Sequence, residues 1–531
     1  MPTLADAPHT RFLVLAVVLA PACVQAPESE EFRGYTTNVT LTAGDDGCNG
    51  GDDVVVDVNP QRSLFETSRA ALSSFSMADT LSAIATNDGL PANPTQLHDQ
   101  LFDTYAEGPG LGLGGHCDDV LDTDGNATLN GFPLQCPRAE SSLASRIGTW
   151  FPIAAVNRFD LAPTDGANCG EARLVFANPG PGRAFVIFEA KIPNPDPGCG
   201  LSACAPVQEF WASLSAVDNP EKRADMLHQA FISGHAGLAA AGFGPFVRAR
   251  NFGVGAGQIR TNNFVQGPWT LREFKLVSTF SKPSPPVPRV RAVQVPVAAN
   301  PFGTIFDESA KLPLGEKCRE AFLATGVQGL MNDDVNLMSV DMPLKCLAAE
   351  SANNFSNRYD LRLTEDGEFW GQIEARIADL DPTSNLTPRD IARRAAFAGA
   401  CIGCHQETNG IELGNTVFAP LSDFFVHTNE FSNEACGDGT TDCFLISTAV
   451  RDSFLPHREA VMEQFLGDSP CCGPGGLDVG FDDAQPIDPF EVMQPAELAD
   501  LDPAGIAEAE AEADANVSPQ TVGGALGVRA H

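Results

Sequence analysis

The stretch Ala400-Cys401-Ile402-Gly403-Cys404-His405 decides how the rest of this chain is interpreted. It has the pattern C-x-x-C-H, which is typical of covalent c-type haem attachment. The two thiols stand about one helical turn apart, so each can add to one vinyl group of the same porphyrin. The histidine that follows then lies under the ring, where a neutral imidazole binds iron. The pattern predicts haem attachment through Cys401 and Cys404, with His405 as an iron ligand.

The residues before this pattern predict a helix that leads into it. Thr387 is a suitable N-cap, and Pro388 suits the first helical position. The run from Arg389 to Ala400 is rich in Ala and Arg, which favour a helix. Phe397 stands four residues before Cys401, so the two lie on one helical face.

This region resembles the cytochrome c family, whose first helix carries an aromatic residue at the offset of Phe397 from Cys401. The segment Phe418-Ala419-Pro420-Leu421 is similar to the family's proline segment, in which a carbonyl orients the iron-binding histidine. The resemblance covers about residues 385–470 and implies a small helical haem domain there.

Two other interpretations of Cys401 and Cys404 stay open. They could form a local disulfide or a redox pair, with His405 incidental, or they could belong to a metal site. A thioredoxin-like pair lies between a strand and a helix of a βαβ unit, whereas this pair follows a helix. Haem attachment is therefore the favoured interpretation.

The sequence does not settle which residue would be the second axial ligand of the iron. We favour His427, because it follows the apolar run Phe424-Phe425-Val426 and so lies near buried surface. His457 and Met462 are also in range, and His427 could instead be a surface histidine. Two histidine ligands give a lower reduction potential than His with Met, and an open position would permit peroxidase chemistry.

The chain is long and strongly acidic. Its 531 residues carry a formal net charge of −36, which argues against nucleic acid or an anionic membrane as electrostatic partner. The segment 471–531 is rich in Ala, Pro, Asp and Glu, and we expect it to be a mostly disordered tail.

The N-terminus reads as an export signal over residues 1–23. Arg11 precedes the apolar run Phe12–Leu19, which is too short to span a bilayer. Cys23 resembles the lipidated cysteine of a bacterial lipobox, and simple secretion is the alternative. Because Val24 follows instead of an acidic residue, we expect an outer-membrane lipoprotein, in the periplasm or at the cell surface.

The cysteines fit an exported protein. Of the fifteen, three are assigned to lipid and haem, which leaves an even number for up to six disulfides. The expected local pairs are Cys199–Cys204, Cys436–Cys443, Cys318–Cys346 and Cys117–Cys136. Cys48, Cys169, Cys471 and Cys472 would close longer loops.

The rest of the chain predicts an α+β fold, a disulfide-containing mixed α/β region followed by the haem domain. We expect a linker at 24–60, an α+β domain at 61–282 and a second α+β subdomain at 283–384, with the stiff Pro283–Pro288 stretch as the boundary. The expected strands are Val54–Val58, Glu171–Ala177, Ala184–Ile192, Gln258–Phe264 and Trp269–Val277. The Pro-Gly segment 178–182 predicts a hairpin between the second and third of these, and the third is apolar on both faces, which suggests a central strand. The expected helices are Ser63–Ile84, Val207–Val217, Pro220–Ser233 and one starting near Pro456 that would close over the helix before Cys401.

Two further patterns are weaker. Asp122 to Leu129 resembles the start of an EF-hand calcium loop, but Ala127 and Pro133 stand where a glycine and a glutamate belong, so we favour a plain turn over calcium. Asn157–Leu161 (NRFDL) recurs as Asn357–Leu361 (NRYDL). Each is followed by Glu-Ala-Arg, which suggests either a duplicated β unit whose Arg and Asp pair structurally, or chance.

Three functions follow from these patterns. The leading one is a mono-haem c-type cytochrome-like lipoprotein that transfers electrons to a redox partner which the sequence does not identify. The second is a haem peroxidase-type enzyme, which needs an exchangeable ligand position. The third is a haem-free, disulfide-rich surface binding protein.

Overall fold

The computed structural model describes a defined part of the chain: residues 58–103, 121, 125, 127–129, 132–135, 138–180, 183–253, 255–265, 267–281, 287–310, 315–354, 357–403, 409–422, 425, 427–436 and 442–468. Several predictions concern residues outside it. These are the export signal with Cys23, the linker to residue 57, the expected strand from Val54, the calcium-loop residues Asp122, Asp124 and Asn126, the pair Cys117–Cys136, Cys404, His405 and the acidic tail.

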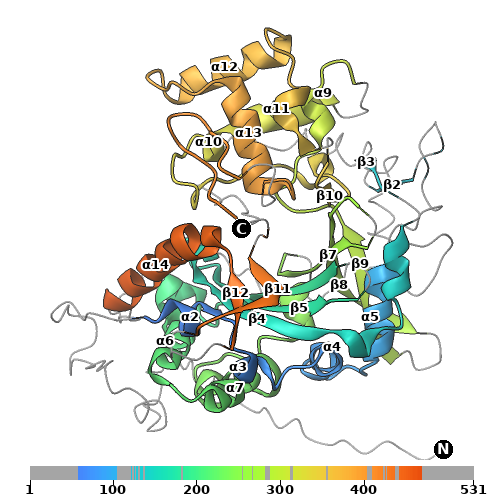
Figure 1. Cartoon of the computed structure of the whole chain (residues 1–531), viewed down its shortest axis with the longest axis vertical. Coiled ribbons are helices and arrows are strands. Elements are labelled where there is room, and N and C mark those ends of the chain that lie inside the picture. The colour runs from blue at the N-terminus through green and yellow to red at the C-terminus, as the bar shows by residue number, and fades with distance from the viewer. Residues whose placement is uncertain are drawn as a thin grey trace, which may run out of the picture.

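A large antiparallel sheet is the centre of the fold (Figure 1). Its strand order is β1-β4-β5-β6-β7-β8-β10, with β9 also paired to β8. The bounds are β1 (Phe65–Glu66), β4 (Phe151–Arg158), β5 (Asn168–Asn178), β6 (Arg183–Pro193), β7 (Gln258–Phe264), β8 (Thr270–Ser281), β9 (Val287–Val295) and β10 (Ser351–Ala352). The mixed α/β character expected from the sequence is confirmed.

The hairpin predicted around residue 180 is present. β5 and β6 pair antiparallel, with Leu174 opposite Phe188. β6 lies between β5 and β7, as expected for a strand that is apolar on both faces. The Pro283–Pro288 stretch lies between β8 and β9, which pair with each other, so one sheet continues across it.

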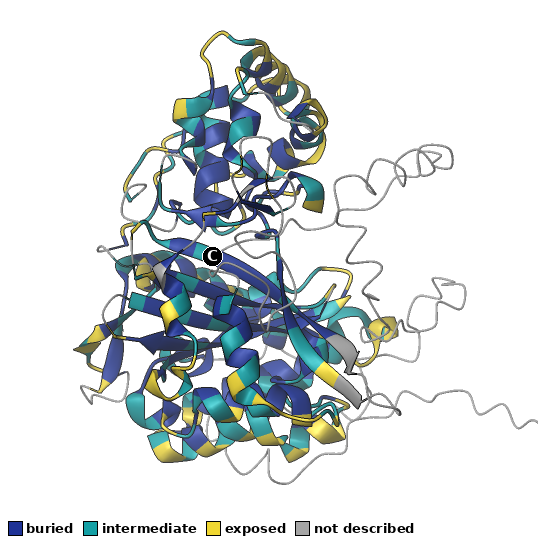
Figure 2. Ribbon diagram, turned by 90° about the vertical axis from the view of Figure 1, so that its right-hand side faces the viewer, coloured by how far each residue is buried: buried dark blue, intermediate teal, exposed yellow. Residues whose placement is uncertain are grey.

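Helices cover both faces of this sheet. Figure 1 shows α3 (Arg69–Leu72), α6 (Ala205–Ser213) and α7 (Pro220–His228) on one side, and α10 to α13 on the other. Figure 2 shows the strands between these layers in dark blue, as buried. Leu174, Phe176, Val186, Phe188 and Phe274 are all at most 1% exposed and alternate along their strands on one face. The remaining helices are α2 (Pro60–Ser63), α4 (Met77–Thr86), α5 (Pro94–Asp103), α8 (Ala236–Ala240), α9 (Gly315–Ala321), α10 (Val327–Leu330), α11 (Tyr359–Arg362), α12 (Glu368–Leu380), α13 (Pro388–Gly399) and α14 (Leu455–Gly467).

The helix expected over Ser63–Ile84 is wrong as a single element. Phe65 and Glu66 form the edge strand β1 beside β4. Ser68 then caps α3, and Ser76 caps α4, each accepting from a backbone amide three residues on. The apolar spacing reflects three short elements that share one core. The helices at Val207 and Pro220 are confirmed as α6 and α7, and Asn219 accepts from the Lys222 amide as N-cap.

The region 385–470 is not purely helical. Besides α13 and α14 it contains β11 (Thr428–Glu434) and β12 (Cys443–Ile446), which pair antiparallel. The expectation that the last helix closes over α13 is wrong: α14 packs against α2, α6 and the turn Phe159–Leu161. Its Phe465 ring lies 4.5 Å from the Phe159 ring, between centroids.

Two predicted disulfides are confirmed and one is wrong. Cys318–Cys346 and Cys436–Cys443 are bonded. Cys204 bonds to Cys169 instead of Cys199, which is itself disulfide-bonded. The loop that carries Cys204 is turned toward Cys169, because the Asn194 side-chain amide donates to both Gly166 O and Gly200 O at 2.7 Å.

The duplicated-β-unit hypothesis is wrong, although the predicted Arg–Asp pairing occurs in both copies. Arg158 binds Asp160 at 2.9 Å, and Arg358 lies 3.4 Å from Asp360. The first copy ends strand β4, whereas the second begins helix α11, and its Glu-Ala-Arg lies inside α12.

Among the described helices, none is both long enough and apolar enough to cross a bilayer.

Candidate functional site

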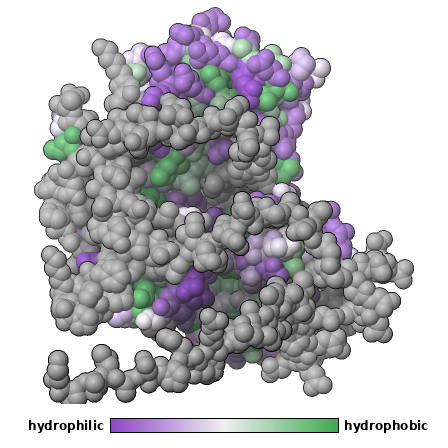
Figure 3. All heavy atoms as spheres, turned by 180° about the vertical axis from the view of Figure 1, so that it is seen from behind, coloured by the Kyte–Doolittle hydropathy of each residue, from purple (hydrophilic) through white to green (hydrophobic). Residues whose placement is uncertain are grey.

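A cavity lies between the sheet and the layer that contains α13. Its atom-free space is about 1320 Å³, a volume that includes open solvent at its mouth. Side chains of β1, of β4 to β8, of the end of α13, of residues 425–428 and of α14 line it. Figure 3 shows apolar side chains, in green, inside a recess between the upper and lower parts of the molecule.

Apolar side chains form most of the cavity wall. The sheet contributes them at alternate positions of neighbouring strands, because every second side chain of a strand points to the same face. Phe185 and Trp269 stack there with ring centroids 5.8 Å apart. Other apolar lining residues are Phe65, Val156, Val175, Ile187, Leu271 and Val297. The wall suits a flat, largely apolar ligand.

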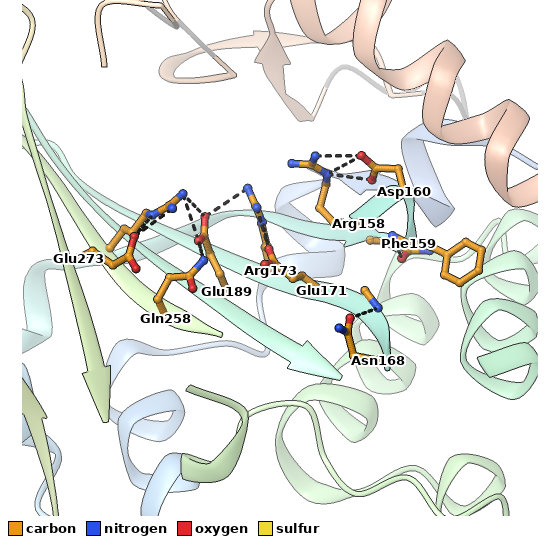
Figure 4. A network of polar contacts seen from close by, with 12 residues as sticks. Arg158, Phe159, Asp160, Asn168, Glu171, Arg173, Glu189, Gln258 and Glu273 are labelled. Atoms are coloured by element: carbon orange, nitrogen blue, oxygen red, sulfur yellow. Dashed lines mark hydrogen bonds and ion pairs between the residues drawn. The ribbon is translucent and has the colours of Figure 1, made fainter. Parts of the chain in front are cut away.

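A row of paired charges crosses the same face of the sheet (Figure 4). Arg173 Nη2 donates to Glu171 Oε2 at 2.7 Å, and its Nη1 lies 3.2 Å from Glu189 Oε1. Arg260 Nη2 lies 3.0 Å from Glu273 Oε2, and its Nη1 is 3.3 Å from Glu189 Oε2. Burial alone would lower the pKa of Arg173, but Glu189 and Glu171 outweigh it and raise that pKa. The arginines therefore stay charged.

More arginines surround the cavity at its margins. Arg158 ends β4 and lies against Asp160. Arg183 begins β6, donates to Glu430 at 2.6 Å and lies 5.3 Å from the centroid of the Trp269 ring. Arg458 comes from α14. Guanidinium groups suit carboxylate ligands, since they offer two parallel donors.

The helix α13 brings Cys401 to this cavity. Thr387 caps its start and Pro388 occupies the first turn, as the sequence predicted, and Asp390 completes a capping box with Thr387. At its end a Cβ on Gly399 would lie 1.6 Å from Ala299 O, and one on Gly403 would lie 2.2 Å from Ala396 O. Only glycine allows this close packing. Phe397 is buried, and Gly399, Ala400 and Cys401 line the cavity.

Cys401 is a free thiol in the structure. Its backbone amide donates to Ser351 Oγ at 2.6 Å, which ties the start of the C-x-x-C-H stretch to strand β10. Burial raises the pKa of the Cys401 thiol to about 12. A free thiol at the cavity wall does not match a preformed Cys401 disulfide.

His427 lines the same cavity, as do its neighbours Phe425 and Thr428. Its carbonyl accepts from the Ser447 amide at 2.9 Å, and β11 begins at the next residue, so its backbone is fixed. The Nδ1 atom of His427 is buried. The structure thus brings together Cys401 and His427, two residues that the sequence proposed for one site.

The alternative second ligands lie elsewhere. Met462 is fully buried, and its sulfur accepts from Asn157 Nδ2 at 3.8 Å. Neither Met462 nor His457 belongs to the described lining of the cavity. Cys404 and His405 lie outside the described residues. Within the described ranges, no group of three or more His, Cys, Asp or Glu side chains is arranged to hold a metal ion.

The arginines of the cavity were missed in the sequence. A signal existed, because Arg173 and Glu189 stand inside otherwise apolar strand runs (EARLVFA and AFVIFEAKI). A charged residue in a covered strand needs a buried partner. Their placement opposite each other depends on the register of β5 and β6, which the sequence alone does not give.

Comparisons with protein-family models, with curated proteins and with solved structures find no match for this chain.

The raised pKa of the half-buried Cys401 has a direct chemical consequence. In protein made without haem, we expect iodoacetamide to modify Cys401 at pH 8 at least about tenfold more slowly than in the same protein unfolded in urea, because the thiolate is the nucleophile. Mass spectrometry of the modified peptide measures both rates. Equal rates in folded and unfolded protein would contradict the burial of this thiol.

Proposed function

We propose that this chain carries a covalent c-type haem in the cavity and transfers electrons at the cell envelope. The observation that supports this most strongly is the meeting of Cys401 and His427 on one cavity. The two residues come from different elements, the end of α13 and the start of β11. Their cavity combines apolar walls with arginines at the margin, which matches a porphyrin and its two carboxylates.

Four residues hold the haem in this proposal. Cys401 and Cys404 would form the thioether bonds, and His405 and His427 would bind the iron. The bound haem supplies one-electron redox chemistry, and two histidine ligands place its potential below that of a His/Met iron.

The remaining residues of the cavity bind and shield the ligand. Val156, Val175, Ile187 and Leu271 line the wall contributed by the sheet and exclude water from it. A dry surrounding tunes the potential of a haem. The short turn held by Gly399 and Gly403 fixes where the attachment stretch leaves α13.

The cellular location proposed for the protein agrees with haem attachment. Three disulfides among the described residues indicate an oxidising compartment, and c-type haem is attached outside the bacterial cytoplasm. We propose export, with Cys23 as a lipid anchor at the outer membrane, and a redox partner that docks from solution.

A haem-stained denaturing gel tests this proposal. Full-length protein exported by a host with cytochrome c maturation should give a stained band, and Cys401→Ala/Cys404→Ala should lose it completely. The control Cys436→Ala/Cys443→Ala removes a disulfide instead and should keep the band. No stain from folded, exported protein would refute haem attachment and leave the surface-binding function.

The visible spectrum separates electron transfer from enzyme chemistry. A six-coordinate, reducible spectrum supports the cytochrome-like function. A five-coordinate spectrum with peroxide turnover would indicate the peroxidase-type enzyme instead.

A further inference from the structure

Arg458 differs from the other arginines at the cavity in how its charge is balanced. It lies on α14, is only 5% exposed and lines the cavity. Its one ion pair with a described residue joins its Nε to Asp160 Oδ1 at 3.9 Å. Asp160 already accepts from Arg158 Nε and Nη2 at 2.9 Å. Two guanidinium groups therefore share one carboxylate.

The Nη1 atom of Arg458 is buried and has no hydrogen-bond partner in the part of the chain that the structure describes. Two other buried arginines, Arg223 and Arg394, have several hydrogen-bond partners each. Arg223 donates to Glu66 at 2.7 Å and to two backbone carbonyls, and Arg394 donates to four carbonyls and to Asp333. A buried guanidinium without a matching anion is costly, because burial removes its hydration.

The charges around Arg458 also indicate that its guanidinium lacks a matching anion. Burial, and then the neighbouring charge of Arg158, lower the pKa of Arg458 well below its usual range, and Asp160 offsets this only in part. Arg173 adds further positive charge, although its own carboxylates are Glu171 and Glu189. An anion at Nη1 would relieve this repulsion.

We propose that Arg458, beside Arg158, is the receptor for a carboxylate carried by the ligand of the cavity. Two sources supply this chemistry: a propionate of the haem, which rests on the function proposed above, or the carboxylate of a small soluble molecule. A carboxylate accepts two parallel bonds from a guanidinium, and the two Nη atoms of Arg458, of which Nη1 is unsatisfied, form such a pair of donors.

The test uses full-length protein exported without haem and three probes: hemin, hemin dimethyl ester and sodium acetate. If the carboxylate comes from haem, hemin should bind about tenfold or more tightly than its dimethyl ester, as expected for a charge-assisted hydrogen bond. Arg458→Met should remove that difference. Soret absorbance measures the binding.

If the carboxylate comes from a soluble molecule, hemin and its ester bind alike. Acetate, but not an equal concentration of chloride, then raises the melting temperature of the wild type and not of Arg458→Met. The control is Arg451→Met, which removes an exposed arginine paired with Glu434 just before α14 and should leave both readouts unchanged.

Stability adds a second readout. Without ligand, Arg458→Met should melt at the same temperature as the wild type or higher, because it removes an unbalanced buried charge. Should this variant fail to fold, Arg458→Lys keeps the charge and loses the planar pair of donors, and it should still lower the preference for hemin over its ester. If neither the hemin preference nor the acetate effect depends on Arg458, the receptor is refuted. If the chain proves not to carry haem, the effect of acetate on the melting temperature alone decides whether Arg458 is a carboxylate receptor.

Discussion

Replacing His427 by alanine is expected to turn a six-coordinate, low-spin haem into a five-coordinate one. Of the three candidates for the second axial ligand, only His427 lines the cavity that Cys401 reaches. Without the His427 imidazole, the sixth coordination position of the proposed haem iron would be open, and small ligands could bind there. Visible spectra of the oxidised and reduced protein measure the change. Carbon monoxide should bind to reduced His427→Ala in full and to the reduced wild type hardly at all.

The matched control for this variant is His457→Ala. His457 lies on α14, outside the described lining of the cavity, so its loss should leave the spectrum unchanged. Peroxide turnover should rise in His427→Ala, because an exchangeable site permits that chemistry. A six-coordinate spectrum that survives in His427→Ala and is lost in His457→Ala would assign the ligand to α14 instead.

Arg394→Met is expected to lower the free energy of unfolding by at least about 3 kcal/mol, because several buried carbonyl oxygens lose their donor and each such loss costs about 1–3 kcal/mol. Arg394 is fully buried inside α13. Its guanidinium donates to Leu413 O at 2.7 Å, to Leu330 O at 3.0 Å and to Asp333 Oδ1 at 2.6 Å. The variant would leave buried carbonyl oxygens without donors and loosen α13 from both neighbouring segments.

Urea denaturation measures this effect, with Arg389→Met as the control on the same helix. Arg389 is partly exposed and pairs with the exposed Glu365, so its replacement should change the free energy of unfolding by less than about 1 kcal/mol. Because α13 ends at the attachment stretch, Arg394→Met should also reduce the yield of haem-bearing protein. Equal effects of the two variants would contradict the structural role of Arg394.

Local features of the fold could be predicted from the sequence because their causes are local. The cap of α13 needs only Thr387, Pro388 and Asp390, and the cap of α7 needs only Asn219 and Pro220. The β5–β6 hairpin follows from two apolar runs around a Pro-Gly turn. Each of these depends on residues that are neighbours in the chain.

Features that depend on long-range packing could not be predicted. Cys204 pairs with Cys169 because Asn194 holds two distant turns together, whereas spacing alone favoured Cys199. The apolar side chains of α14 predicted that the helix packs on the core. They did not predict that it packs against α2 and α6 and not against α13. The second copy (NRYDL) begins the short helix α11, and the Glu-Ala-Arg that follows it lies in α12, where Phe369, Ile373 and Ile377 recur at helical spacing.

The candidate site divides in the same way. The chemistry of Cys401 follows from its own motif, and His427 was favoured from the apolar residues before it. The arginines come from four strands (β4 to β7) and from α14, and the positions of those in the strands depend on the register of the sheet. The unbalanced charge of Arg458 depends on how α14 packs, so only the folded structure reveals it.

Mass spectrometry of one tryptic peptide tests the haem proposal most directly. Cleavage after Arg394 and Arg451 releases Ala395–Arg451, which contains Cys401, Cys404, His405 and His427 and no other Lys or Arg. From protein exported with cytochrome c maturation, this peptide should carry the mass of one haem on Cys401 and Cys404. The unmodified peptide, or one with a Cys401–Cys404 disulfide, would contradict the account.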